Sequence, residues 1–287
     1  GSPVPLVGHN KNLGWSHTVN SPDLVDIYKL TINPENSNQY WFEGFWKDMK
    51  VREAPIKVKL FGLFPWTFKR DVKESIHGPV MEFDHGAYAL RISSLKNLNF
   101  IEQWYRMGKA KNIKEFRRAM EIHAIPMFNT GYADRDGNIY YVYNAKIPIR
   151  DPRYDWSEFL PSESKNSLWY RYIPFNDLPQ VLNPLDGFFQ NCNSSPYLAT
   201  GNRVDIQKVL PDWTGIEDHQ TNRALRSLET FGIQSSITRN DFFDYKYDVE
   251  YSKESVMAYV RDKYIEDMKD NDQSILEEAL LLIKNWN

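Results

Sequence analysis

The chain reads GHNKNLGWSHTV over residues 8–19 and LVDIYKL over residues 24–30. Both stretches are predicted to contain β-strands, and Pro22 separates them. Further strands are predicted at 39–42, 51–60, 66–76 and 88–92. Residues 1–95 are therefore expected to be a strand-rich segment.

The composition changes after this segment. Residues 96–147 are predicted to hold two helices, over 99–107 and 113–123, followed by a hairpin over 127–143 with a turn at Asp136-Gly137. Asn112 is the expected N-cap of the second helix. Residues 148–187 are predicted to be a long irregular connection. Residues 188–287 are predicted to hold an asparagine-containing, amide-rich run and helices near 217–231, 252–265 and 272–286. This order predicts an α+β fold, taken as one partial domain over residues 1–287.

Composition excludes several classes of protein. The formal net charge is -3, which argues against a nucleic-acid binder held by phosphate contacts. Cys192 is the single cysteine, so there is no internal disulfide and no multi-cysteine metal centre. No apolar run is long enough for a transmembrane helix. Aromatic residues make up 15% of the chain, which favours a β-rich fold with aromatic-lined surfaces.

Individual residues point to chemistry only weakly. None of the six histidines has metal-ligand spacing, and the chain contains no nucleophile elbow, P-loop or dinucleotide fingerprint. Cys192 is more simply a small neutral packing residue than a nucleophile, because no basic neighbour in sequence would lower the pKa of its thiol.

Two segments leave alternatives open. Asp23 and Asp26, with the Val25 carbonyl between them, would suit a hard cation such as calcium, or they are solvated turn acids. The amide-rich run Gln190–Pro196 follows two phenylalanines. It would present a side-chain N–H to a developing oxyanion, or it is a hydrogen-bonded loop.

Four segments taken in order resemble one known family. GHNKNLGWSHTV followed by DLVDIY, then IHGPV at 76–80, the hairpin over 129–140, and QNCNSSP at 190–196 are similar to the penicillin acylase (penicillin amidase) family of N-terminal-nucleophile hydrolases. The WSHTV form is closer to the cephalosporin acylase and acyl-homoserine-lactone acylase branch. The resemblance covers essentially the whole chain.

The resemblance implies an incomplete αββα sandwich with antiparallel sheets and helices. Family members are made as precursors with a signal peptide, and autoproteolysis exposes an N-terminal Ser on the β chain. The α-amino group of this Ser acts as the base while its hydroxyl attacks an amide carbonyl. No cofactor is required.

The family motifs also imply roles for particular residues. The Val19 backbone N–H and the Asn193 side-chain amide match the oxyanion hole, and Arg223, with Arg226 close by, matches an orienting arginine. Asp23, Val25 (through its carbonyl) and Asp26 match the structural calcium site of some members.

The nucleophilic Ser is expected to lie before Gly1, so the chain looks like an internal fragment of a β chain that is inactive alone. The expected partners are an N-acyl amide substrate of the β-lactam or acyl-homoserine-lactone type, the α chain and the remaining β-chain segments. A periplasmic or secreted location is expected by family habit. Two alternatives stay open, a ligand-binding module and an interaction domain of a degenerate acylase.

Overall fold

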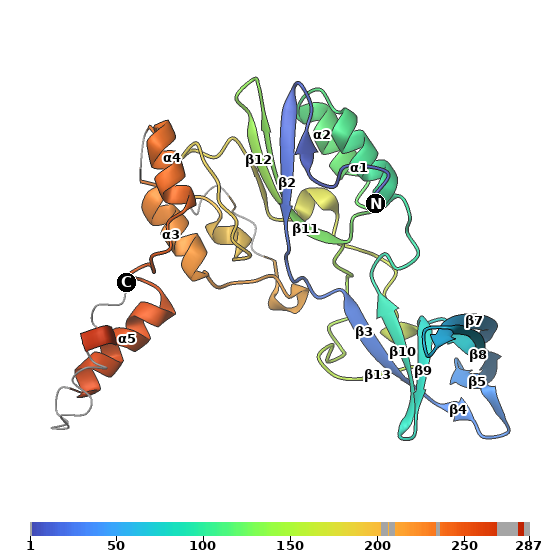
Figure 1. Cartoon of the computed structure of the whole chain (residues 1–287). Coiled ribbons are helices and arrows are strands. Elements are labelled where there is room, and N and C mark those ends of the chain that lie inside the picture. Colours follow the sequence, from blue (N-terminus) through green and yellow to red (C-terminus); the bar gives the residue numbers. More distant parts are fainter. Residues whose placement is uncertain (1, 202–205, 207–209, 234–235, 269–280, 284–287) are drawn as a thin grey trace.

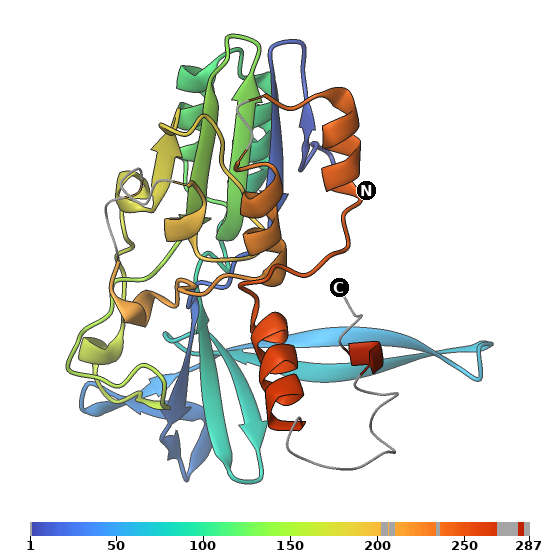
Figure 2. The same cartoon turned by 90° about the vertical axis from the view of Figure 1, so that its left-hand side faces the viewer.

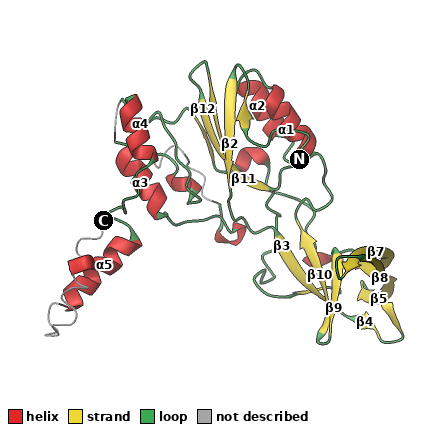
Figure 3. Cartoon of the chain, in the orientation of Figure 1, coloured by secondary structure: helices red, strands yellow, loops and turns green. Residues whose placement is uncertain are grey.

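The computed structural model describes residues 2–201, 206, 210–233, 236–268 and 281–283. These residues form helices and mainly antiparallel sheets, so the predicted α+β class is confirmed (Figures 1 and 3). Within the described residues no helix is long and apolar enough to cross a membrane.

The upper part of Figure 1 is a five-stranded antiparallel sheet. In spatial order its strands are β1 (Gly8–His9), β2 (Leu13–Thr18), β11 (Met127–Asp134), β12 (Ile139–Ala145) and β14 (Gln180–Leu182). The predicted hairpin is confirmed as β11 and β12. Its turn contains Gly137 at φ 87°, and the Asp134 carboxylate accepts the N–H groups of Asp136 and Asn138.

Two helices cover one face of this sheet, α1 (Phe100–Lys109) and α2 (Ile113–Met120) (Figure 1). The predicted cap is confirmed, because the Asn112 side chain accepts the Glu115 N–H at 3.0 Å. Phe116 on α2 is fully buried, and its ring lies 4.7 Å from that of Tyr132 on β11. Burying a side chain of this size stabilises the fold by about 2–3 kcal/mol.

The lower part of the molecule is a six-stranded sheet with a small three-stranded sheet beside it (Figure 2). The larger sheet has the order β13 (Leu160–Pro161), β3 (Val25–Leu30), β10 (Gly86–Ile92), β9 (Pro79–Phe83), β8 (Phe64–Glu74) and β7 (Lys50–Leu60). The smaller sheet contains β4 (Ile32–Asn33), β5 (Asn36–Phe42) and β6 (Phe45–Asp48). A second core lies here, built around the fully buried Tyr28 and Tyr40.

The IHGPV motif has a structural role at this place. Gly78 adopts φ 144°, and an added Cβ would lie 1.9 Å from the Leu90 carbonyl oxygen on the neighbouring strand. Only glycine allows this close approach. His77 is buried against the rings of Tyr28 and Phe42, and burial, together with the charges of Arg91 and Lys47, lowers the pKa of His77 to about 3.

The rest of the chain is helical or irregular. The segment 148–187 contains only short elements, among them η1 (Lys165–Ser167) and η2 (Phe175–Asp177). Farther along lie η3 (Pro196–Leu198), η5 (Asp212–Thr214), α3 (Asn222–Thr230), α4 (Arg239–Lys246) and α5 (Val256–Met268).

The C-terminal helices differ in part from the expectation. The helix expected near 217–231 begins only at Asn222, because Thr221 caps it by accepting the Ala224 N–H. Helix α4 was not predicted, and the helix expected over 272–286 falls almost wholly outside the described residues.

Candidate active site

Two residues predicted to act together meet at the end of β2. Val19 directly follows that strand, and the Asn193 side-chain Nδ2 donates a hydrogen bond to the Val19 carbonyl oxygen at 2.7 Å. The two residues are 174 positions apart in the chain. Within the described residues the Val19 N–H has no hydrogen-bond acceptor. The Asn193 side-chain amide and the unpaired Val19 N–H therefore belong to two residues that are in direct contact. A developing oxyanion is stabilised by two such N–H donors placed together.

Asn193 is held in an unusual conformation. Its φ is 57°, a left-handed value that asparagine tolerates better than most residues. Arg223 Nη2 donates to Asn193 Oδ1 at 2.8 Å and to the Cys192 carbonyl oxygen at 3.0 Å. The guanidinium therefore fixes the orientation of the amide, with oxygen toward Arg223 and nitrogen toward Val19. The positive charge at Oδ1 also polarises the amide and strengthens Nδ2 as a donor.

The structure distinguishes the two arginines near this loop. Arg226 forms ion pairs with Glu229, Asp248 and Glu250 and contacts neither Asn193 nor Val19 among the described atoms. Arg223, which the motif comparison favoured, is the one placed against Asn193. Its orienting role remains a prediction.

A buried network ties the loop of Asn193 to the sheet. The Asn191 Oδ1 atom accepts the Thr18 hydroxyl and, at 3.2 Å, the Asn193 backbone N–H. The Asn191 Nδ2 atom donates to the Tyr141 hydroxyl at 3.3 Å, and that hydroxyl donates to Asn129 Oδ1 at 2.8 Å. The network joins β2, β11 and β12 to the loop, so the sheet fixes the distance between the Val19 N–H and the Asn193 amide.

Sequence reasoning missed most of this network. Asn191 lies in the amide-rich run that was singled out, but its partners Thr18, Asn129 and Tyr141 gave no signal of their own. Their roles depend on strand register, which pairs Thr18 with Asn129 and places Tyr141 on the next strand.

His17 and Cys192 are neutral groups beside the site. Trp104 Nε1 donates to His17 Nε2 at 3.0 Å, so Nε2 is an acceptor and the ring proton is assigned to Nδ1, which faces Thr130 Oγ1 at 3.0 Å. Burial lowers the pKa of His17. Burial raises the pKa of the Cys192 thiol, although Arg223 opposes this. The geometry therefore favours a packing role for Cys192, as the sequence did.

The proposed calcium ligands lie elsewhere, and their partner is an arginine. Arg150 Nη2 lies 2.9 Å from Asp23 Oδ1, and Arg150 Nε lies 3.1 Å from Asp26 Oδ2. Trp169 Nε1 donates to the same Asp26 oxygen at 2.5 Å. Burial raises the pKa of Asp26, and the Arg150 charge opposes that rise.

These residues do not fit a calcium ion. Calcium takes six to eight oxygen ligands, whereas both carboxylates here already pair with a guanidinium, whose positive charge would repel a divalent cation. The Val25 carbonyl belongs to β3, inside the six-stranded sheet. Over the part of the chain that the structure describes, no cluster of acidic, histidine or cysteine side chains is suited to a metal. Sequence reasoning missed Arg150, which lies 124 residues from Asp26.

The site lies on the face of the five-stranded sheet opposite α1 and α2. Figure 1 shows α3, which carries Arg223, on one side of β2 and β12, with α1 and α2 on the other. Figure 2, turned by a quarter, shows the same arrangement from the side of α3. The Val19 N–H and the Asn193 amide thus lie together at the end of β2, on the sheet face that α3 occupies.

Comparisons with known proteins identify the family of the chain. The family model for penicillin amidase matches residues 1–287. Penicillin G acylase of Escherichia coli is 32% identical over 198 residues, which cover 68% of this chain and 23% of that protein. Acyl-homoserine lactone acylase PvdQ of Pseudomonas fluorescens is 27% identical over 225 residues, which cover 69% of this chain and 29% of that protein.

A solved structure extends the similarity to the fold. Thermostable penicillin G acylase from Alcaligenes faecalis aligns with a TM-score of 0.74 and 25% identity over 96% of this chain and 47% of its own. The chain belongs to the penicillin amidase family. The predicted N-terminal-nucleophile hydrolase fold is thereby confirmed, in the incomplete form expected. The chain spans less than a third of the two curated relatives and just under half of the solved relative.

Proposed function

We propose that this chain supplies the oxyanion-binding part of an acylase that hydrolyses the amide bond of an N-acylated small molecule. The observation that carries the proposal is the meeting of the Asn193 amide with Val19 at the end of β2. Family membership supports the reaction class, because the named relatives are acylases. The proposed substrates are β-lactams or acyl-homoserine lactones.

The mechanism assigns the nucleophilic serine to a segment outside residues 1–287. Its hydroxyl oxygen bonds to the amide carbonyl carbon, its proton passes to its own α-amino group, and the carbonyl π electrons move onto oxygen. The second hydrogen of Asn193 Nδ2 and the Val19 N–H would donate to that oxygen. Each such donor is worth about 3 kcal/mol in the transition state. The α-ammonium group then gives its proton to the amide nitrogen, and the C–N bond breaks to release the amine and leave an acyl-enzyme. Water adds to the acyl carbon of this ester, with its proton taken by the α-amino group, and the serine hydroxyl leaves with that proton to free the carboxylic acid.

The remaining expectations belong to the same proposal. The complete protein would be exported to the periplasm or secreted, and this chain would pair with an α chain and with further β-chain segments. Calcium has no part in the proposal, since Arg150 already pairs with both Asp23 and Asp26.

The first test uses the complete gene product. Intact mass and N-terminal sequencing of each chain would show two chains, with the one that contains Val19 and Asn193 beginning at Ser, Thr or Cys. A single uncut chain without amidase activity would contradict the proposal and favour a degenerate, non-catalytic relative.

The second test is Asn193→Ala, assayed with a panel of N-acyl nitroanilides. We expect kcat to fall roughly 100- to 1000-fold, because one oxyanion donor is lost. Asn183→Ala is the matched control, since Asn183 also adopts a positive φ, of 52°, in a loop away from the site. Equal activity of the two variants would refute the role of Asn193.

A further inference from the structure

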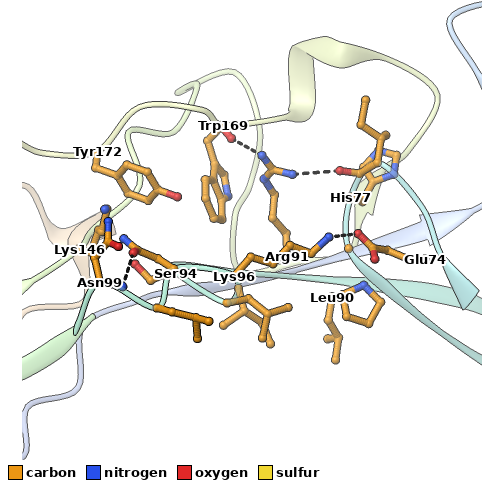
Figure 4. A pocket seen from close by; sticks show the side chains of 17 residues that line it. Glu74, His77, Leu90, Arg91, Ser94, Lys96, Asn99, Lys146, Trp169 and Tyr172 are labelled. Atoms are coloured by element: carbon orange, nitrogen blue, oxygen red, sulfur yellow. Dashed lines mark hydrogen bonds and ion pairs between the residues drawn. The ribbon is translucent and has the colours of Figure 1, made fainter. Parts of the chain in front are cut away.

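A cleft of about 700 Å³ lies in the lower half of the molecule, away from the Val19–Asn193 site. Its walls come from the end of β10, the turn over 94–99, the start of β9 and the segment that carries Trp169 and Tyr172 (Figure 4). It shares no lining residue with the oxyanion donors or with the network around Asn191. Its volume is within the range of small-molecule sites.

Two cations in this cleft lack a carboxylate partner. Arg91 donates to two carbonyl oxygens, that of Ile76 at 3.2 Å and that of Trp169 at 2.6 Å, and Lys146 Nζ lies 4.9 Å above the Tyr172 ring. No acidic side chain among the described residues lies within ion-pair distance of either one. A partly buried ammonium without a counter-ion is costly, and an anion that enters the cleft would remove that cost.

The electrostatic balance of the lining is positive. Glu74 is the one acid in the wall, and Lys96 pairs with it, which leaves Arg91 and Lys146 uncompensated. His77 lines the same cleft, and its pKa is lowered chiefly by burial and further by the positive charge of Arg91. Burial also lowers the pKa of Lys146.

The cleft also offers a partly exposed aromatic ring and spare donors. The Tyr172 ring is partly exposed and lies 5.7 Å from the ring of Trp169, which is itself buried with Arg91 stacked over it at 4.4 Å. Arg91 Nε and Ser94 Oγ are buried without a hydrogen-bond partner. Ser94 adopts φ 61°, a left-handed value that is uncommon for serine. Buried donors without acceptors, beside unpaired cations and aromatic rings, are the features of a site for an acid with an apolar body.

We propose that this cleft binds a small organic carboxylate whose apolar part lies against Tyr172 and whose anionic end takes Lys146 and Ser94. Figure 4 shows Lys146, Ser94 and Asn99 together at the end of the cleft below Tyr172. Arg91 carries the positive charge in the middle of the cleft, fixed by its two carbonyl partners. The proposal goes beyond amide hydrolysis and does not depend on it.

The test is calorimetric titration of the complete protein with phenylbutyrate and with the neutral alcohol 4-phenylbutanol, which has no amide bond to hydrolyse. The two probes differ in charge and little in shape, so we expect the acid to bind at least tenfold more tightly than the alcohol. Lys146→Met should weaken acid binding at least tenfold, and Lys146→Arg should largely retain it. Lys114→Met, on the exposed face of α2, is the matched control and should leave the affinity unchanged.

Two further variants make the result specific. Ser94→Ala keeps the backbone and should weaken acid binding several-fold, whereas Asn193→Ala should leave it unchanged, which separates this site from the catalytic one. Equal affinity for acid and alcohol, undiminished binding by Lys146→Met, or no heat at millimolar acid would overturn the proposal.

Discussion

The proposed oxyanion role of Val19 rests on its backbone N–H, so the sharpest perturbation is Val19→Pro. Proline removes that N–H and retains the carbonyl oxygen that accepts Asn193 Nδ2. Thr18 is an extended strand residue, which is the conformation that a following proline favours. Val19 is not among the residues with positive φ, and proline requires a negative φ.

The expected effect is large on catalysis and small on stability. No hydrogen bond within the described residues is lost, so the free energy of unfolding should change by less than about 1 kcal/mol. Loss of one oxyanion donor costs about 3 kcal/mol in the transition state, which is a decrease in kcat of roughly 100-fold or more. KM should change little, because the ground-state carbonyl gains less from the donor than the oxyanion does.

The assay compares kcat and KM for hydrolysis of an N-acyl nitroanilide by the complete processed protein. Val19→Ala is the control, since it removes the half-exposed side chain and keeps the N–H. An amide-to-ester replacement at Val19 makes the same test without the proline ring. If Val19→Pro folds and turns over substrate as fast as Val19→Ala, the N–H does not bind the oxyanion and the reasoning fails.

Three other changes test separate parts of the structure. Thr18→Val should lower kcat roughly tenfold with KM unchanged, because it removes the hydrogen bond that links β2 to the loop of Asn193. The control Thr67→Val, at an exposed position, should leave kcat unchanged. A loss of stability of about 1 kcal/mol without a loss of kcat would show that the Thr18 hydrogen bond is only structural. Chelators should leave the melting temperature of the complete protein unchanged, and a decrease on adding a chelator would restore the calcium hypothesis. Arg150→Gln should destabilise the protein by about 3–5 kcal/mol, since two carboxylates lose their partner. Burial lowers the pKa of His123 to about 4 and that of His77 to about 3, so the unfolded state takes up protons before the folded state as the pH falls below 6.5. Urea titrations should therefore show about 2 kcal/mol less stability per histidine at about pH 5 than at about pH 7. A free energy of unfolding that does not change between these pH values would contradict this.

Local signals in the sequence predicted the local structure well. The turn at Asp136-Gly137 and the cap at Asn112 are each decided by residues within a few positions of one another, and both are confirmed. Helix α4 was missed, although Thr238 and Asp241 form a capping box at its start, because the helix buries no side chain and so shows no apolar periodicity.

Long-range partners could not be predicted in the same way. Asp23 and Asp26, three residues apart, present the same oxygens to a calcium ion or to a guanidinium, and only the folded chain brings Arg150 to them. The pairing of Val19 with Asn193 came from the family resemblance, since no local pattern links residues 174 positions apart.

The pleat of β2 explains why the WSHTV motif carries so much of the site. Successive side chains of a strand point to opposite faces. Trp15 and His17 accordingly face the helices, where Trp15 packs near Phe116 and His17 accepts the Trp104 N–H. Thr18 faces the other way and binds Asn191, and Val19 follows where the strand ends. A shift of one residue in register would turn Thr18 toward the helices and carry the Val19 N–H away from Asn193. The contacts of Trp15 and His17 therefore set the strand register on which the oxyanion donors depend.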